Sequence, residues 1–404
     1  MQTSTRNSNL VYLFTSVTML IWTNTLFMSV LVLLISQPQS ATYSDYSRLY
    51  TNITTGYSTV IRPVINQSEP LTVYVKFELS QIIGVDELAQ TVNLNVWINF
   101  TWQDEVRTWT PADYGNVDIV YPKPSDIWLP APLLLNSVGD GDVFGNKRAA
   151  TSITSDGVTA WLPGSLLSFS CSLDLTYFPF DKQRCRMEFL FNTLEKELNF
   201  VETQSTYYQS KFVSNGEWDL ERVMFEKDIL KYPNAFASFS FDVVLKRRPE
   251  YFIINVILPI QAISLLSCFV FVLPVDSGER AGFSTALLLS IVVFMGNIGS
   301  QSADKSDPMP LVIIYVFCMS ILSITSVIAT AVQLHVVRKN SSFTEHRESE
   351  EDQDKLKEKT GQGLKTKPNA NIVLFTGYFS VWCLINIYFL IHFLTGTKHN
   401  TEIY

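Results

Sequence analysis

Four long apolar runs in the second half of the chain predict membrane-spanning helices. Each run has 20 or more residues, and its only potentially ionisable side chains are cysteines, tyrosines and one histidine. A helix of this length crosses roughly 30 Å of hydrocarbon and pairs its own backbone polar groups. The four runs are Tyr251–Leu273, Ala281–Ser300, Leu311–Leu334 and Ile372–Leu394.

A fifth uncharged run lies near the start of the chain, at Leu10–Ile35. Its most apolar part, Leu26–Ile35, has the length of a signal-peptide core, and small or polar residues follow it. We therefore predict a signal peptide over residues 1–40 that is cleaved near residue 40, with an uncleaved signal anchor as the alternative. Either arrangement places the segment up to residue 250 outside the cell.

Between about residue 70 and residue 250 the apolar positions recur with a period of two, which predicts β-strands. Every second side chain of Val92–Trp102 is apolar, and turn-forming clusters such as Ser214–Gly216 separate the short runs. This pattern indicates an immunoglobulin-like β-sandwich. Trp97 is a large aromatic residue on the polar face of its strand, which fits either a packing contact between subunits or a recognition surface.

The patterns together predict an alternation of outer, membrane and cytoplasmic segments. Residues 338–371 hold eight Lys/Arg and seven Asp/Glu with little apolar content, as expected of a solvated linker. The predicted order is an extracellular domain at 41–250, transmembrane helices 1–3 at 251–337, a cytoplasmic linker at 338–371, transmembrane helix 4 at 372–394 and an extracellular tail at 395–404.

Composition and motifs exclude several classes of function. The net charge is −8 and no basic cluster is interleaved with aromatic residues, so the sequence has no nucleic-acid-binding signature. No phosphate-binding loop, nucleophile elbow or zinc motif is present, which argues against an enzyme and predicts neither cofactor nor metal. Sequons at Asn52, Asn66 and Asn99 predict glycosylation of the outer domain.

Cysteine usage separates the outer domain from the membrane helices. Cys171 and Cys185 are the only two cysteines of the predicted outer domain, and an oxidising compartment favours a disulfide between them. Cys268, Cys318 and Cys383 fall one per membrane helix and are expected to be small buried apolar residues.

The segment between Cys171 and Cys185 has thirteen residues and contains Phe178-Pro179-Phe180-Asp181. It resembles the signature loop of the Cys-loop receptors, which are pentameric ligand-gated ion channels. Asn95-Val96-Trp97 and Asp276–Arg280 match further motifs in the family's order. The similarity is greatest to the nicotinic acetylcholine receptor branch, as an invertebrate-type subunit, although the chain lacks the adjacent cysteine pair of acetylcholine-binding subunits.

The resemblance implies a pentamer of identical or related subunits in the plasma membrane, with an extracellular ligand site at each interface. The second membrane helix would line a pore for cations, because Glu279 at its cytoplasmic end would form a ring of carboxylates. Gly282, Ala286, Leu289 and Val293 recur at steps of three and four and form one stripe. A stripe of small residues also fits helix–helix contact. Gly282 and Ala286 replace the hydroxyl residues usual in the family's cation channels.

The ligand site implied by the resemblance departs from the family's aromatic box. Trp97 matches the tryptophan of the complementary face, but Leu135 and Asn192 stand where the principal face has a tyrosine and a tryptophan. Losing two rings removes much of the cation–π attraction, so we expect a larger, partly apolar small-molecule ligand and not classical acetylcholine binding. The predicted set is Trp97, Leu135, Ala160, Leu162, Asn192, Tyr232 and Phe236.

The resemblance also implies a contact that transmits ligand binding to the pore. Charged groups at the boundary of the outer and membrane domains could form a two-state contact, and a solvated charge cluster is the alternative. Other expected partners are membrane lipids and permeant cations. An accessory or assembly subunit without autonomous channel activity is the competing function. The predicted coupling residues are Glu87, Phe178, Pro179, Phe180, Asp181 and Arg247.

Overall fold

The computed structural model describes most of the outer domain and the membrane helices. At 297–301, 341, 343–351, 368–369 and 397–403 only the backbone is described. The predicted signal peptide lies outside the described residues except at a few positions, and Tyr232 lies outside them as well. The described residues are 19, 21–26, 28, 41–145, 149–203, 212–227, 236–275, 279–301, 309–351 and 368–403.

The chain divides into two compact units that are interleaved along the sequence. The first unit contains residues 1–66, 102–129 and 150–161. The second contains residues 67–101, 130–149 and 162–404.

Helix α2 (Tyr43–Thr54) belongs to the first unit, and the alternation pattern did not predict it. The Thr42 side chain accepts a hydrogen bond from the amide of Asp45, whose carboxylate accepts one from the amide of Thr42. Leu49 and Ile53, four residues apart, form its buried stripe. The Thr-x-x-Asp spacing of this capping box is the signal that could have revealed the helix. Its other elements are η1 (Pro111–Tyr114), β3 (Ile119–Val120), η2 (Pro124–Asp126), β5 (Ala150–Thr154) and most of β6 (Val158–Leu162).

Two sheets form a β-sandwich in the second unit, which confirms the predicted fold class. One sheet has the order β7-β2-β1-β9, with β1 and β9 parallel, and the other has the order β10-β11-β8-β4. The strands of the first sheet are β1 (Leu71–Asp86), β2 (Thr91–Gln103), β7 (Gly164–Ser170) and β9 (Leu198–Glu202), and β2 continues into the first unit at its end. Those of the second are β4 (Leu133–Leu134), β8 (Lys182–Leu194), β10 (Trp218–Glu226) and β11 (Phe236–Arg247).

Phenylalanine rings fill the space between the two sheets. Phe77 of β1 lies 5.0 Å from Phe241 of β11, and Phe100 of β2 lies 6.5 Å from Phe239, measured between ring centroids. Burying a phenylalanine stabilises a fold by about 1.5–3 kcal/mol, so this layer is a major part of the core. The alternation predicted over residues 92–102 is confirmed, because the apolar positions are buried and Trp97 is exposed.

Four helices in the second unit are long and apolar enough to span a membrane, in agreement with the four predicted runs. In the first, a π turn precedes Pro259, whose missing amide hydrogen interrupts the α-helical pattern. The third, α6, continues through residues 338–351 of the predicted linker. The elements are α3 (Glu250–Phe252), η3 (Ile253–Ile257), α4 (Leu258–Phe269) and η4 (Val270–Val272) in the first span, then α5 (Glu279–Gln301), α6 (Leu311–Glu351) and α7 (Pro368–Ile403).

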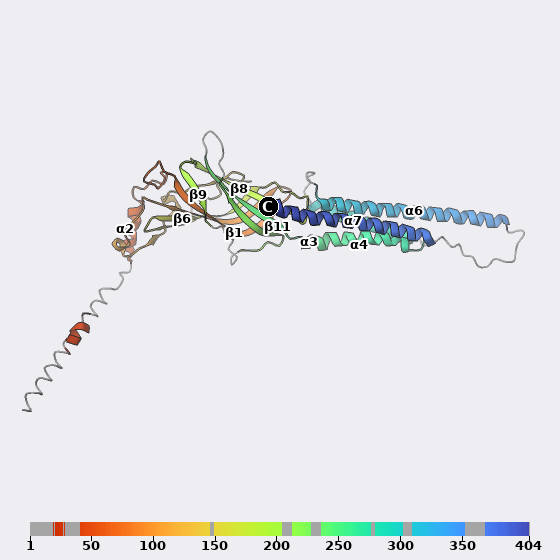
Figure 1. Ribbon diagram of the computed structural model, residues 1–404, viewed down its shortest axis with the longest axis horizontal. Helices are drawn as coiled ribbons and strands as arrows, with labels where there is room; N and C mark the ends of the chain where they lie inside the picture. Colours follow the sequence, from red (N-terminus) through yellow and green to blue (C-terminus); the bar gives the residue numbers. More distant parts are fainter. Residues whose placement is uncertain are drawn as a thin grey trace, which may run out of the picture. The chain divides into compact units, whose positions relative to one another are not determined.

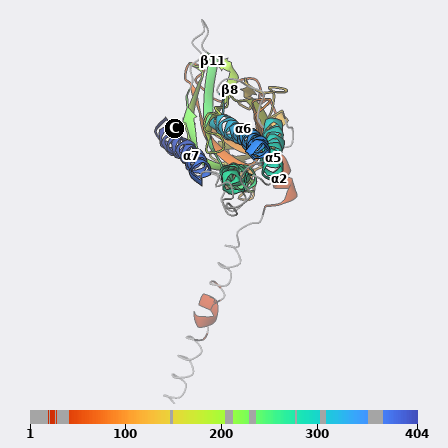
Figure 2. The ribbon, with the colours of Figure 1, turned by 90° about the vertical axis from the view of Figure 1, so that its right-hand side faces the viewer.

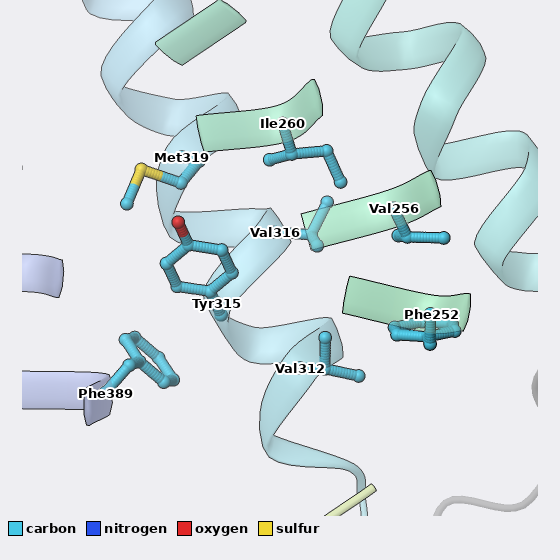
Figure 3. Packing of buried hydrophobic residues seen from close by; sticks show 8 residues of the cluster. All are labelled: Phe252, Val256, Ile260, Val312, Tyr315, Val316, Met319 and Phe389. Carbon is cyan, nitrogen blue, oxygen red and sulfur yellow. The ribbon is translucent and has the colours of Figure 1, made fainter. Parts of the chain in front are cut away.

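The spanning helices pack alongside one another, as Figures 1 and 2 show for α4, α6 and α7. Two hydrogen bonds join all three, from Gln261 Nε2 on α4 (3.2 Å) and from the Tyr315 hydroxyl on α6 (3.1 Å) to Asn386 Oδ1 on α7. Such bonds hold helices together where apolar side chains gain little from leaving lipid. Figure 3 shows the apolar cluster around them, formed by Phe252, Val256, Ile260, Val312, Tyr315, Val316, Met319 and Phe389.

Candidate functional site

The predicted disulfide between Cys171 and Cys185 is present, with Cα atoms 5.3 Å apart. It closes a loop whose tip packs on the membrane helices of the same unit. Phe178 lies 4.7 Å from Phe252 at the start of the first span, and Phe180 lies 5.3 Å from Phe393 of α7. The Phe178–Pro179 peptide bond is cis.

The same loop is joined to the start of α6 and the end of α7. The amide of Leu311, the first residue of α6, donates a hydrogen bond of 3.0 Å to the carbonyl of Thr176. Gly396 of α7 approaches Tyr177 so closely that a Cβ at position 396 would lie 2.0 Å from the ring. The disulfide loop therefore touches three of the four spanning helices, since Phe178 and Phe180 already contact the first and the fourth.

Arg247, the last residue of β11, is surrounded by three carboxylates. Its Nε donates to Asp181 Oδ1 at 2.9 Å and its Nη2 donates to Glu87 Oε1 at 2.8 Å, while Nη1 donates to Glu217. Asp181 comes from the disulfide loop, Glu87 follows β1 and Glu217 precedes β10. We call Arg247, Glu87, Asp181 and Glu217 the Arg247 cluster. It joins three segments that are far apart in the sequence.

Aromatic rings cover both sides of the guanidinium. The Arg247 Cζ atom lies 4.1 Å from the ring centroid of Trp218 and 4.7 Å from that of Phe178, within cation–π distance. Only 3% of the Arg247 side chain is exposed. A guanidinium this deeply buried requires partners for its charge, so the alternative of a solvated charge cluster does not describe this arginine.

The cluster has one positively charged group and three carboxyl groups, so the carboxyl groups outnumber the positive charge that can pair with them. Burial lowers the pKa of Arg247, but Asp181 and Glu87 raise it, and the net shift is upward. Burial raises the pKa of Glu217, Arg247 lowers it, and Glu87 raises it again, so that it stays above its ordinary value.

Sequence reasoning predicted Arg247, Glu87 and Asp181 but missed Glu217 and Trp218. These two residues directly follow the turn-forming Ser214–Gly216 cluster. Asn215 Oδ1 accepts hydrogen bonds from both of their amides, at 2.7 Å and 3.0 Å. A buried tryptophan beside an acid after such a turn is a signal, but only the fold brings it to Arg247.

Trp97 lies on β2 with 42% of its surface exposed. It pairs with Gly164 of β7, and a Cβ on Gly164 would lie 2.6 Å from the indole ring, so the ring rests directly on the glycine backbone. Asn99, two residues along the same face, is half-buried, and its Oδ1 finds no hydrogen-bond partner among the described residues. Leu162 is half-buried, and Ala160, also half-buried, belongs to the first unit.

Leu135, Asn192 and Phe236 all belong to the other sheet, on or beside its β4, β8 and β11 strands. Leu135 follows β4 and donates its amide to the carbonyl of Glu188 at 2.8 Å. Leu135, Asn192 and Phe236 are exposed, and Phe236 pairs with Leu194 near the end of β8. The structure brings these three onto one sheet and places Trp97 on the other, while Tyr232 lies outside the described residues.

Helix α5 has one buried and one exposed face. Arg280, Ser284, Leu287 and Ile291 are buried, and they recur at steps of three and four. The Arg280 Nη2 donates a hydrogen bond of 2.7 Å to Gln333 Oε1 of α6, which ties the start of α5 to its neighbour. This face is the one that packs inside the subunit.

The predicted stripe of α5 lies on the opposite side of the helix. Leu289 and Val293 are 64% and 59% exposed, and Gly282, Ala286 and Glu279 are exposed as well. At 3.6 residues per turn these positions centre about 180° from the buried face. In the single chain the stripe is therefore exposed, and it does not form the contact between helices of one subunit.

The three sequon asparagines differ in their surroundings. Asn52 is exposed on α2 and Asn66 is exposed in an irregular segment, whereas Asn99 is half-buried in the middle of β2.

Family models match most of the chain, from α2 to the start of α7. Residues 46–249 match the neurotransmitter-gated ion-channel ligand binding domain, and residues 256–373 match the neurotransmitter-gated ion-channel transmembrane region. The boundary between the two matches falls at the end of β11 and the start of the first span.

Curated relatives include acetylcholine receptor subunits of animals. The chain is 34% identical to acetylcholine receptor subunit alpha-type acr-16 of Caenorhabditis elegans over 72% of this chain and 59% of that protein. It is 31% identical to the neuronal acetylcholine receptor subunit beta-3 of Homo sapiens over 78% of this chain and 70% of that protein. It is also 31% identical to the acetylcholine receptor subunit alpha-like of Manduca sexta, over 72% and 59% respectively. The chain thus spans about three fifths of the length of several relatives it matches.

Proposed function

The chain belongs to the neurotransmitter-gated ion-channel family, and from this premise we propose that it is one subunit of a pentameric, ligand-gated, cation-conducting channel of nicotinic type. Its β-sandwich domain is extracellular and its four helices cross the plasma membrane. The single observation that carries the proposal is the exposed stripe of α5, which faces away from the rest of the subunit.

Five copies of α5 around one axis would turn this stripe inward. Leu289 and Val293 would then form two apolar rings, which close a narrow pore to ions by excluding water. Glu279, exposed at the start of the helix, would form a ring of five carboxylates that attracts cations. Gly282 and Ala286 would leave the cytoplasmic half of the pore without hydroxyl groups, so its conductance differs from that of a hydroxyl-lined pore.

The ligand would bind between two subunits, because Trp97 and the set formed by Leu135, Asn192 and Phe236 lie on different sheets of one chain. Trp97 supplies a flat exposed ring, while Leu135 and Phe236 supply apolar surface. With Leu135 and Asn192 at two of the family's aromatic positions, this chemistry favours a ligand larger and less polar than acetylcholine. Ala160, Leu162 and Tyr232 complete the proposed lining.

The Arg247 cluster would transmit the effect of the ligand to the pore. It connects β11, which begins at Phe236 of the proposed ligand site, to the disulfide loop that packs on the membrane helices. Phe178 contacts both Arg247 and Phe252, so a shift of the strand displaces the loop and the first span together. Arg247 and Asp181 form a buried ion pair, which has few alternative arrangements and suits a two-state contact.

A second function is favoured by the altered principal face. With Leu135 and Asn192 in place of aromatic residues, the chain could serve as an accessory subunit that contributes only its Trp97 face to the site of a partner. Expression alone and together with related subunits separates the two, because an accessory subunit gives current only in the mixture.

Cysteine labelling tests the pore without knowledge of the agonist. In a background with the three membrane cysteines replaced by serine, Leu289→Cys and Val293→Cys should react with a membrane-impermeant thiol reagent applied from both sides. Ile291→Cys is the matched control, because Ile291 is fully buried on the opposite face. Equal labelling at all three positions, or images of the purified protein without fivefold symmetry, would refute the channel.

A further inference from the structure

The first unit carries a groove of about 770 Å³ between helix α2 and the short helix η1. This volume falls in the range that holds a ligand of drug-like size. Polar and aromatic side chains line it together, among them Tyr43, Ser47, Arg48, Thr51, Asn52 and Tyr114. The groove belongs to the extracellular domain, and none of its lining residues is among those proposed for ligand binding, coupling or the pore.

Asn52 lines this groove and is the acceptor residue of the sequon Asn52-Ile53-Thr54. Its Nδ2 lies 3.1 Å from the Tyr114 hydroxyl, to which it donates a hydrogen bond. Nδ2 is the atom that carries the sugar in an N-linked glycan, and here it contacts Tyr114, which also lines the groove. Ile53 is buried and Thr54 is half-buried, so of the sequon it is Asn52 that is open to solvent.

We infer that Asn52 carries an N-linked glycan and that the first sugars of this glycan occupy the groove between α2 and η1. The donor would be an oligosaccharide linked to a lipid diphosphate in the secretory pathway. The bond from sugar C1 to the diphosphate oxygen breaks, a bond from C1 to Nδ2 forms, and Nδ2 loses one proton. The lipid diphosphate leaves, so no oxidant or reductant is needed.

The groove offers aromatic rings for the apolar face of a sugar and a hydrogen-bond donor for its hydroxyl groups. The Tyr43 ring is 90% exposed and the Tyr114 ring lies under Arg48, whose Cζ is 5.2 Å from the ring centroid. Aromatic rings pack against the apolar face of a sugar ring. The Arg48 Nη2 donates hydrogen bonds to the carbonyl of Asp113 at 2.6 Å and to the carboxylate of Asp45 at 3.3 Å. A guanidinium has further N–H donors that can bond sugar hydroxyls.

Such a glycan would join two elements that are otherwise held by few contacts. The Asn52–Tyr114 and Arg48–Asp113 hydrogen bonds connect α2 to η1 from exposed positions. Exposed bonds of this kind contribute little because water competes for both partners. Sugars that span from Asn52 to the Tyr114 ring would add apolar contact between the helices. The glycan is thus expected to fix α2 and to do more than increase solubility.

Occupancy is tested on the full chain purified from animal cell membranes. Peptide mass spectrometry should find a glycan at Asn52 in the natural chain and in Thr54→Ser, which keeps the sequon and the hydroxyl that bonds the Tyr50 carbonyl at 2.8 Å. The same peptide should be unmodified in Thr54→Ala. An unmodified Asn52 in the natural chain overturns the inference.

Whether the sugar occupies the groove is tested by enzymatic release of the glycan from the native protein. A peptide amidase that removes N-glycans and leaves aspartate should act on Asn52 slowly in the folded chain, and at least several-fold faster in Tyr43→Ala. Tyr43 is almost fully exposed, so this substitution leaves the fold intact, and Tyr114→Ala provides a second variant. Release at Asn66 should not change in either variant. Equal release rates at Asn52 in all three proteins would show that the glycan does not occupy the groove.

Discussion

The two ends of strand β11 are built in opposite ways. At its start Phe236 is exposed beside Leu194, among apolar or small polar residues, whereas at its end Arg247 is buried among three carboxylates and two rings. A substitution at an exposed position usually changes stability by less than about 0.5 kcal/mol, but breaking a buried ion pair costs about 3–5 kcal/mol. In the proposed function, the ligand end can therefore change residue by residue while the coupling end must remain complete. This contrast would account for Leu135 and Asn192 at the proposed ligand face beside a complete Arg247 cluster.

The largest effect is expected for Arg247→Ala. The substitution leaves Glu87, Asp181 and Glu217 facing one another without a counter-charge, and it should abolish ligand-evoked current while protein still reaches the cell surface. Surface biotinylation and recordings across a panel of extracellular ligands measure the two outcomes. The matched control is Arg248→Ala, because Arg248 is 40% exposed and pairs with Asp219.

If Arg247→Ala gives normal currents, the Arg247 cluster is not required for gating. The two ends of β11 then do not differ in their tolerance to substitution. Loss of surface protein in Arg247→Ala but not in Arg248→Ala would instead make the cluster a folding element, and Arg247→Lys then provides the test of gating.

An intermediate effect is expected when aromatic residues are restored to the ligand face. The double variant Leu135→Tyr, Asn192→Trp should gain a response to acetylcholine, since each cation–π contact adds about 0.5–2 kcal/mol and every 1.4 kcal/mol is about tenfold in affinity. Concentration–response curves should shift by roughly tenfold or more. Leu133→Tyr is the control, because Leu133 is also exposed and lies two residues away. If the double variant responds no better than this control, the proposed principal face is misplaced.

The smallest effect concerns pH and compares two acids that flank Trp218. The pKa of Glu217 is raised, chiefly by burial, so the folded state binds its proton more readily than the unfolded state does. The stability that Glu217 contributes is thus greatest at low pH and is lost as pH rises through the raised pKa. The pKa of Asp219 is lowered by its hydrogen bond to Arg248, so its contribution is lost only when pH falls through that lowered pKa.

Melting temperatures measured in detergent between pH 7 and pH 4 separate these two acids. Glu217→Gln should flatten the dependence on pH, by less than about 1 kcal/mol or a few degrees because half of the side chain is exposed, while Asp219→Asn leaves the profile in this window unchanged. If both variants flatten the pH profile equally, Glu217 contributes no more to the pH dependence of stability than Asp219 does.

Much of the architecture could be predicted from local patterns. The four spanning helices follow from run length, because lipid requires about 20 apolar residues in a helix. The sandwich follows from alternation, and the exposure of Trp97 followed from its place on a polar face. The period of three and four placed the α5 stripe on one side of its helix. Each of these features depends only on residues close together in the sequence.

What the sequence did not reveal depends on distant residues or on side-chain signals outside the dominant pattern. Helix α2 has only Leu49 and Ile53 buried, too few for a clear helical period, and its capping box was the remaining signal. Glu217 completes the Arg247 cluster from a turn 30 residues away, as does Glu87 from 160 residues away. Glu87 was found only through the family resemblance, because no local property of an acid at the end of a strand points to a distant arginine.

The glycine under Trp97 sets the height of the indole above the sheet. Because Gly164 has no Cβ, the ring lies flat against the main chain of the neighbouring strand, and its position is fixed by the backbone alone. Any other amino acid at position 164 would displace the ring from this position and, in the proposed site, narrow the space left for a ligand. In related receptors, a new ligand preference would therefore arise more readily through substitutions on the side of the site opposite Trp97 than through a substitution of Gly164.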